Sequence, residues 1–198
     1  MPLLTRRALL SVFLLLPAWR PAAAAPVRYV LDQDRSEVGF SFDLAGTRLR
    51  GTMPVARAEV LVDLNDLSRS NVDVTLDVAK ARVALPLARQ AMLGPEVLWA
   101  ERYPEIRFVS ARVRLGPEGR ISEGAEIVGH LTIRDVTRPV TLRAALYRQP
   151  GSPPEDLDLL EIRLTGSISR RAFGASGRAD IVRDRVDLDI TATIRRAE

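Results

Sequence analysis

The sequence of 198 residues contains no cysteine, one histidine and a single lysine among its 29 basic residues. Without cysteine, the chain can form no disulfide, carry no lipid on a thiol and offer no thiolate to a metal ion. Its fold must therefore be stabilised by a packed core alone. The one lysine, Lys80, reflects a compositional preference for arginine and indicates no particular site.

A large excess of positive charge is also lacking once the first residues are set aside. The whole chain has a net charge of +4, but residues 1–25 contain three arginines and no acidic residue. The remaining residues carry 26 basic and 25 acidic side chains. This balance argues against a nucleic-acid partner, which selects a basic surface. The composition, 46% hydrophobic and 27% charged, is that of a globular protein and excludes disorder.

The N-terminus has the three parts of a secretory signal peptide. Arg6-Arg7 forms a charged start, Ala8–Leu16 is apolar, and a small-residue end contains Ala22 and Ala24. The apolar run is too short to span a bilayer. We therefore expect a signal peptide over residues 1–24, one exported domain over residues 25–198, and a periplasmic or secreted location. The paired arginines also resemble a twin-arginine signal, so both export routes stay open.

From residue 27 onward, apolar residues recur at every second position, which is the period of a β-strand. The runs are Val38–Leu44, Thr47–Met53, Val72–Val78, Ile106 to a turn at Gly116–Gly119, Ile127–Ile133, Val140–Leu146, Leu160–Ile168 and Val186–Ala192. Such alternation predicts an all-β, antiparallel protein of eight or nine strands with one solvated face. A sheet of this size must close or split in two.

Two segments interrupt the alternation. Apolar residues at helical spacing predict a short helix that begins at Pro86 and stops at Gly94-Pro95, with a second turn bearing Trp99 over Glu96–Arg102. The segment Gln149–Asp156 is rich in proline and glycine and predicts an exposed loop.

No pattern of side chains points to catalysis. His130 lies within a strand, and a serine triad or a metal site would depend on it alone. Asp187 and Asp189 share one strand face at a spacing of about 7 Å, which two-carboxylate hydrolases also use. Arg183 and Arg185 have the same parity, however, so a solvated outer face explains the pair better. We expect neither an enzyme nor a bound metal.

The apolar face itself is the remaining candidate site. A closed sheet of about eight strands either fills with its own side chains or holds one small ligand. Small residues in step with the apolar runs favour a cavity; they are Gly51, Gly129, Ala144, Gly166 and Ala192. The side chains that we expect to line it are Phe40, Phe42, Met53, Trp99, Phe108, Leu131, Ile133 and Phe173. Periodicity alone fits a solid core equally well.

The segment Ile127–Leu142 resembles the YceI-like polyisoprenoid-binding family, which has G-x-L-T-I-x-G-V-T-x-P-V at this place. Further landmarks are similar in the same order: Leu31-Asp32 with Ser36, Val38 and Phe40, then Trp99–Phe108, Arg170–Gly174 and Val182–Ile190. The resemblance covers about residues 27–195. Arg35 stands where the family has histidine, and Asp135 stands where it has a turn glycine.

The resemblance implies an extended lipocalin-like β-barrel with a short helical segment between two strands. It also implies a long apolar cavity that holds an isoprenoid lipid or the tail of a polyprenyl quinone. The leading hypothesis is thus an exported soluble carrier or sequestering protein, with transient contact to a membrane or membrane protein. The alternatives are a lipocalin-like enzyme acting on a lipid, and a stress or electron-transfer accessory protein with a solid core.

The leader generates a first prediction. The mature protein should begin at Ala25, because Ala22-x-Ala24 fits the cleavage rule and a cut after Ala25 would place Pro26 directly behind the scissile bond. The intact mass of the exported protein measures this directly, and a mass that includes Leu9–Leu16 contradicts it. Replacing Arg6 and Arg7 by lysine should leave general secretion intact but block twin-arginine export.

Overall fold

The computed structural model describes residues 26–116, 124–148, 151, 153 and 156–197. Within them the chain forms one antiparallel sheet, a short helix and three single-turn 3₁₀ helices. The predicted signal peptide, most of the predicted Gly116–Gly119 turn and part of the predicted Gln149–Asp156 loop lie outside the described residues. No described helix has the length and apolar character needed to cross a membrane.

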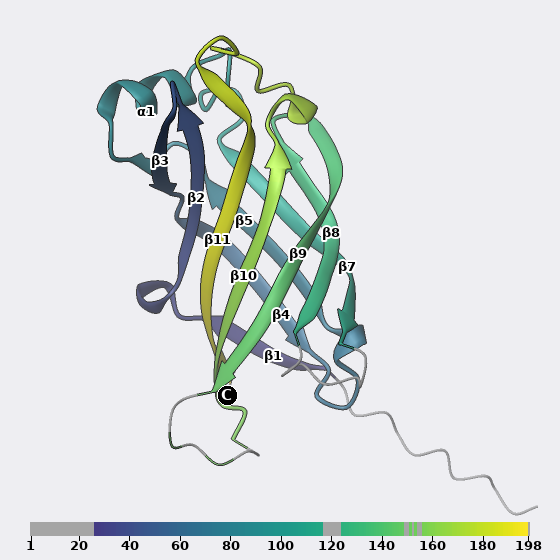
Figure 1. Cartoon of the computed structure of the whole chain (residues 1–198). Coiled ribbons are helices and arrows are strands. Elements are labelled where there is room, and N and C mark those ends of the chain that lie inside the picture. The colour runs from purple at the N-terminus through teal and green to yellow at the C-terminus, as the bar shows by residue number, and fades with distance from the viewer. Residues whose placement is uncertain (1–25, 117–123, 149–150, 152, 154–155, 198) are drawn as a thin grey trace, which may run out of the picture.

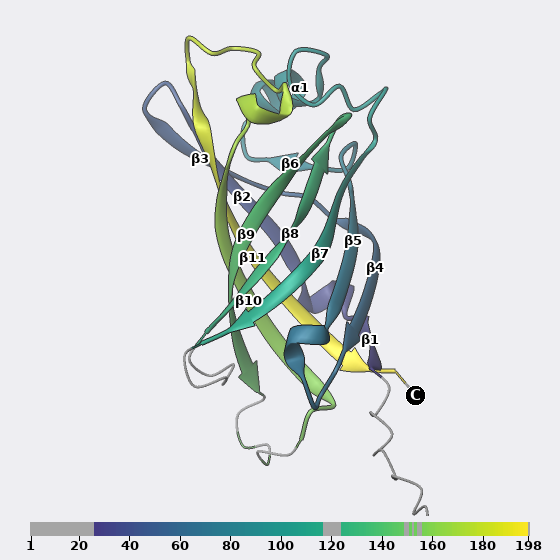
Figure 2. The ribbon, with the colours of Figure 1, turned by 90° about the vertical axis from the view of Figure 1, so that its right-hand side faces the viewer.

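The sheet closes into a barrel (Figures 1 and 2). Its strands are β1 (Val27–Leu31), β2 (Glu37–Leu44), β3 (Thr47–Thr52), β4 (Val55–Val62), β5 (Asn71–Asp77), β6 (Arg82–Val83), β7 (Glu105–Leu115), β8 (Ala125–Ile133), β9 (Val136–Arg148), β10 (Leu159–Ser169) and β11 (Val182–Arg196). Eight of them pair in a ring, in the order β1-β4-β5-β7-β8-β9-β10-β11 and back to β1. The prediction of an all-β, lipocalin-like antiparallel barrel is confirmed.

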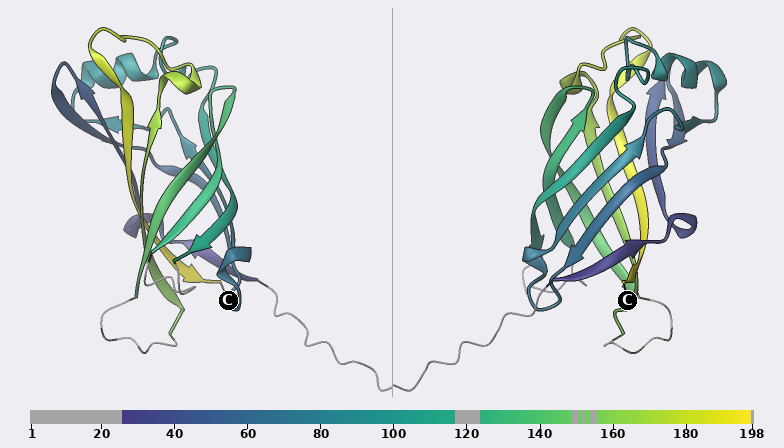
Figure 3. Two further views of the ribbon diagram at one scale, coloured as in Figure 1. Left: turned by 45° about the vertical axis from the view of Figure 1, so that its right-hand side comes forward. Right: turned by 180° about the vertical axis from the view of Figure 1, so that it is seen from behind.

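Three strands of the ring are interrupted along their length. The last strand, β11, pairs with β1 through Ile194–Arg196 and with β2 through Val182–Thr191. Likewise, β3 pairs with β2 and β6, whereas β4 pairs with β1 and β5. β1 and β2 are therefore the two halves of one strand path in the barrel wall. β3 with β4, and β5 with β6, form two further paths of this kind. Counted this way, eight paths follow one another around the barrel in sequence order (Figure 3).

The predicted helix is present as α1 (Pro86–Leu93), with proline in its first turn and Gly94 as its C-cap. The expected second helical turn is a series of turns instead, and Trp99 within it has a positive φ of 50°. Alternation did not reveal β4, because a bulge between Val55 and Arg57 shifts the parity of its side chains.

One end of the barrel, the closed end, is a packed core. Its buried residues are Tyr29, Val60, Val62, Leu160 and Ile194. The hydroxyl of Tyr29 donates a hydrogen bond of 2.8 Å to the carbonyl of Leu157, so the one buried phenol at this end is paired. The C-terminus of the chain lies at this end, and α1 lies at the other (Figure 1).

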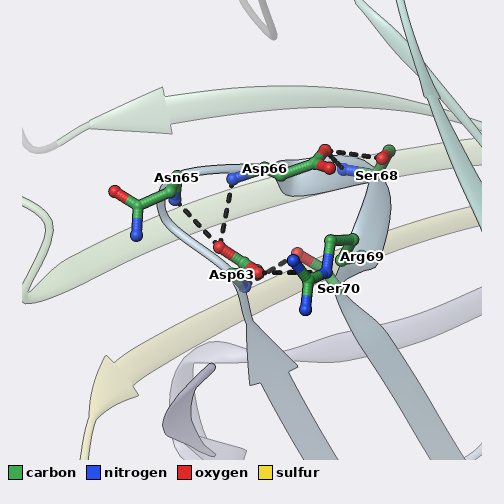
Figure 4. A network of polar contacts seen from close by, with 6 residues as sticks. All are labelled: Asp63, Asn65, Asp66, Ser68, Arg69 and Ser70. Carbon is green, nitrogen blue, oxygen red and sulfur yellow. Dashed lines mark hydrogen bonds and ion pairs between the residues drawn. The ribbon is translucent and has the colours of Figure 1, made fainter. Parts of the chain in front are cut away.

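The connection between β4 and β5 is held at the closed end by a buried carboxylate (Figure 4). Asp63, only 2% exposed, accepts hydrogen bonds from the backbone N–H groups of Asn65 and Asp66, both at 3.0 Å. Its own N–H donates to the hydroxyl of Ser70, and Arg69 lies 3.5 Å from its second oxygen. The buried charge is thus compensated by donors from its own loop.

The long connection between β10 and β11 lies at the end opposite the closed end, beside α1 (Figure 2). It contains the 3₁₀ turn η4 (Arg171–Phe173). Asp184 anchors this turn, because its carboxylate accepts hydrogen bonds from the Arg171 N–H at 2.9 Å and the Ser169 hydroxyl at 2.7 Å. These donors hold the pKa of Asp184 below its usual value.

This anchor generates a prediction for pH dependence. A carboxyl whose pKa is lowered by folding stabilises the fold fully above its unfolded pKa of about 4, and that stability is lost as pH falls through the folded pKa. Asp184→Asn should lower the free energy of unfolding at pH 7 by roughly 1 kcal/mol. The difference from wild type should shrink below about pH 4. Thermal unfolding of both proteins across this pH range measures the difference, and Asp180→Asn, at an exposed position, is the control. A stability difference between Asp184→Asn and wild type that is equal at pH 7 and pH 3 contradicts the prediction.

Candidate lipid-binding cavity

The barrel encloses a cavity of about 530 Å³. This volume lies in the range of small-molecule binding sites and far exceeds an ordinary packing defect. Apolar side chains from every strand path line it. Among the residues that the structure describes, the lining contains four polar side chains, namely Ser36, Thr191, Arg170 and Arg178. The solid core that periodicity had left open is therefore not what this interior contains.

The cavity reaches from the closed end to the opposite end of the barrel, which we call the open end. Along β11, lining residues run from Val182 to Ile194. A strand of that length rises about 40 Å, or roughly 30 Å along the barrel axis at a typical tilt. At the open end Leu85, Leu87 and Ile181 line the cavity and are also exposed. The opening to solvent lies there.

The structure brings six of the eight predicted lining residues together in the cavity wall. They are Phe40 and Phe42 on β2, Met53 after β3, Phe108 on β7, and Leu131 and Ile133 on β8. The rings of Phe40 and Phe42 are stacked with centroids 6.3 Å apart. Contact of these side chains with a ligand stays a prediction.

Trp99, the seventh predicted residue, does not line the cavity. Its ring packs edge-on against Tyr103 at 5.9 Å, and the guanidinium groups of Arg102 and Arg134 lie over it at 4.8 and 5.9 Å. Arg134 also donates to the carbonyl of Gly174 at 2.7 Å. Trp99 therefore ties the segment after α1 to the β8–β9 turn and to the β10–β11 connection.

Phe173, the eighth, does not line the cavity either. It is 2% exposed and belongs to a buried cluster with Met53, Ile133 and Val140. Its turn, η4, ends at Gly174 with a positive φ of 73°. The aromatic side chain thus anchors the turn beside the cavity, and its position on a 3₁₀ turn could not be obtained from strand parity.

The prediction that Gly51 and Gly129 leave open volume is wrong. A Cβ atom on Gly51 would lie 2.4 Å from the ring of Phe40, and one on Gly129 would lie 2.4 Å from the ring of Phe108. Both would also approach a backbone carbonyl within 2.6 Å. Each glycine lets an aromatic ring from the neighbouring strand lie flat on the sheet. These positions shape the wall of the cavity and hold none of its volume.

Arg170 is a buried arginine at the open end that sequence reasoning did not select as a site residue. It is 6% exposed, and its guanidinium donates to the carbonyls of Ala175, Gly177, Val182 and Arg183 at 2.5 to 3.2 Å. Burial lowers its pKa below the usual value. Four carbonyl acceptors, two in the β10–β11 connection and two in the first residues of β11, compensate the desolvated charge and fix the shape of the opening.

Other lining residues were also missed, for two reasons. Val55, Ala58 and Val60 belong to β4, whose parity the bulge obscures. Ala88, Ala91 and Met92 present the inner face of α1 to the cavity. The helical spacing of this second group was visible in the sequence, but nothing in it showed that the helix would lie across a barrel end.

The candidate catalytic residues lie on the outside. His130 is exposed on the outer face of β8, as its parity predicted. The carboxylate of Asp187 pairs with Arg185 at 2.6 Å and Arg48 at 2.5 Å, and both arginines lower its pKa. Arg183 pairs with Asp43 instead. The described residues contain no group of three His, Cys, Asp or Glu side chains arranged to hold a metal ion.

This geometry can separate a long apolar chain from water. A wall with no carboxylate or imidazole among its described lining residues offers no general acid or base to a ligand inside it. The two lining arginines both lie in the β10–β11 connection at the open end, so a polar headgroup would lie there and the tail would extend toward the closed end.

Comparison with known proteins places the chain among relatives of similar sequence and fold. A UPF0312 protein of Serratia proteamaculans is 32% identical over 91 residues, which are 46% of this chain and 45% of that protein. A UPF0312 protein of Pseudomonas putida is 26% identical over 161 residues, 81% of this chain and 78% of that protein. The chain thus spans less than half of the first relative and most of the second.

Solved structures share the barrel. BcnA of Burkholderia cenocepacia superposes with a TM-score of 0.70 at 19% identity, over 83% of this chain and 99% of that one. A polyisoprenoid binding domain from Saccharophagus degradans superposes with a TM-score of 0.60 at 9% identity, over 86% and 99%. The family model for the YceI-like domain matches residues 29–194, nearly the whole barrel. This chain belongs to the YceI-like domain family.

Proposed function

We propose that the protein binds an isoprenoid lipid, or the tail of a polyprenyl quinone, in its cavity and acts as an exported carrier or sequestering protein. The observation that carries this proposal is an apolar cavity of about 530 Å³ that runs along the barrel and opens at one end. The structurally similar domain from Saccharophagus degradans is a polyisoprenoid binding domain, which agrees with this proposal.

The energetics of such a ligand suit this wall. Each methylene removed from water contributes about 0.8 kcal/mol, so a chain of several isoprene units binds without any charged contact. The same chain is nearly insoluble in water, so it would need a protein carrier to cross an aqueous compartment. A cavity that extends along the barrel also fits a linear run of isoprene units better than a compact ring system.

A binding role agrees better with the interior than either alternative from the sequence. An enzyme acting on the tail would need general acid or base groups. The polar side chains of the described lining are two hydroxyls and two arginines, and none is a carboxylate or an imidazole. An accessory protein with a solid core would not maintain a cavity of this size, because unfilled apolar volume costs packing contacts.

The first test is the content of the purified protein. Protein exported with its own N-terminal segment should release an isoprenoid lipid or quinone on organic extraction, at about one molecule per chain by mass spectrometry. Ligand that binds only the folded state stabilises it, so the extracted protein should melt at a lower temperature than the loaded one. Protein that carries no isoprenoid and gains no stability from added geranylgeraniol contradicts the proposal.

The second test narrows the cavity. Ala192 lines it on β11, and a larger side chain there extends into the interior. Ala192→Phe should reduce bound geranylgeraniol about tenfold, because the displaced methylenes lose roughly 1.4 kcal/mol of burial. Ala145→Phe is the matched control, since Ala145 faces outward on β9 opposite Arg163. Equal binding by both variants would show that the ligand does not occupy the cavity.

A further inference from the structure

The open end exposes apolar side chains that continue the cavity wall. Leu85, Leu87 and Ile181 are 42%, 74% and 42% exposed, and all three line the cavity. Single exposed apolar residues are ordinary on a protein surface, but a group around one opening indicates an interaction site. The other large exposed apolar residues, Val30, Leu61 and Tyr147, lie on separate strands and do not line the cavity.

The described connections at the two barrel ends differ in the sign of their net charge. The connections at the open end are residues 45–46, 78–104, 134–135 and 170–181, which contain eight basic and four acidic residues. At the closed end, the described residues 63–70 and 156–158 contain one basic and four acidic residues. The mature chain is almost neutral as a whole, so the surplus at the open end is a local property. It is complementary to an anionic surface.

The basic and apolar side chains at this end are interleaved. Arg178 lines the mouth between Gly177 and Ile181 and has a positive φ of 56°. Lys80 and Arg89 lie on either side of Leu85 and Leu87 in sequence. Lys80 forms an exposed ion pair with Asp77 at 3.0 Å, and Arg89 donates to the carbonyls of Ala79 and Ala81. Arg171 lies on η4. Long basic side chains extend their charge to phosphates while apolar neighbours enter the acyl boundary.

We propose that the open end, defined by the rim Leu85, Leu87 and Ile181 and its surrounding basic residues, docks on the surface of a membrane that contains anionic lipid. This inference rests on the proposed function, because docking would let an isoprenoid tail pass between bilayer and cavity without crossing water. The closed end, with its packed core and acidic connections, faces away from the membrane.

A lipid surface fits this end better than a protein partner does. The described rim has only three exposed apolar side chains, two on the segment that enters α1 and one in the β10–β11 connection. Stable protein interfaces bury a much broader apolar face. Proteins recognise an anionic bilayer by a few apolar side chains that insert into it and by basic residues spread around them.

Vesicle sedimentation tests the proposal with the mature protein. We expect it to pellet with vesicles of three parts phosphatidylcholine to one part phosphatidylglycerol and to bind pure phosphatidylcholine at least about tenfold more weakly. Leu85→Gln/Leu87→Gln should lose about tenfold in affinity for the anionic vesicles. The matched control is Val30→Gln/Leu61→Gln, which places the same change away from the mouth and should bind as wild type.

A second pair of variants isolates the charge. Lys80→Glu/Arg171→Glu changes two basic residues of the open end that do not line the cavity, and should lose at least about tenfold in binding to anionic vesicles. Arg112→Glu/Arg143→Glu makes the same change in net charge on the outer faces of β7 and β9 and should have little effect. Equal losses in both pairs would show a response to net charge alone and would overturn the proposed orientation.

Failure of this inference can be told from failure of the proposed function. Wild-type protein that takes up geranylgeraniol in solution but does not pellet with either vesicle overturns docking and leaves the binding function standing. Protein that docks through the rim but takes up no geranylgeraniol supports docking and overturns the binding function. A third outcome is that the protein binds native membranes but not vesicles, and that protease treatment of the membranes abolishes this binding. It would indicate a membrane-protein partner and would overturn the proposal of a lipid surface.

Discussion

The short pairing between the first and last strands is the constraint on which this structure depends. β1 fits between β4 and the final residues of β11, and three residue pairs join it to β11. This pairing closes the ring and places Tyr29 inside, where it packs on Ile194 at the end of the same ladder. Because the closed end is a packed core, the interior that the structure describes opens to solvent at the other end.

The interior combines two kinds of packing that have opposite consequences. At the closed end, side chains such as Leu160 and Val62 belong to one buried cluster that fills the barrel. Further along, Phe40 and Phe108 lie flat over Gly51 and Gly129, which keeps bulky rings against the wall and away from the axis. Aliphatic side chains therefore give a packed seal at one end, and aromatic rings held against glycines leave an open tube beyond it.

Much of the fold was predictable from the sequence, and the limits of that prediction have physical causes. Two-residue alternation locates strands and their inner faces, so Leu131 and Ile133 were placed correctly on the wall. It cannot give volume, because whether a glycine leaves space depends on the neighbouring strand. It fails at a bulge, as in β4. It also says nothing about Arg170, whose burial depends on four carbonyls from the β10–β11 connection and the start of β11.

At the open end, the arrangement that would bury the most apolar surface differs from the arrangement that the structure has. A helix needed only to cover the barrel would bury its apolar residues, yet α1 presents Ala88 and Met92 inward while Leu87 remains 74% exposed. Arg170 and Trp99 meanwhile brace the segments on either side of the mouth from positions outside or at the edge of the tube. A rigid frame around an exposed apolar opening suits the proposed passage of a water-insoluble chain, because the frame keeps the opening available and the proposed ligand would supply the missing burial.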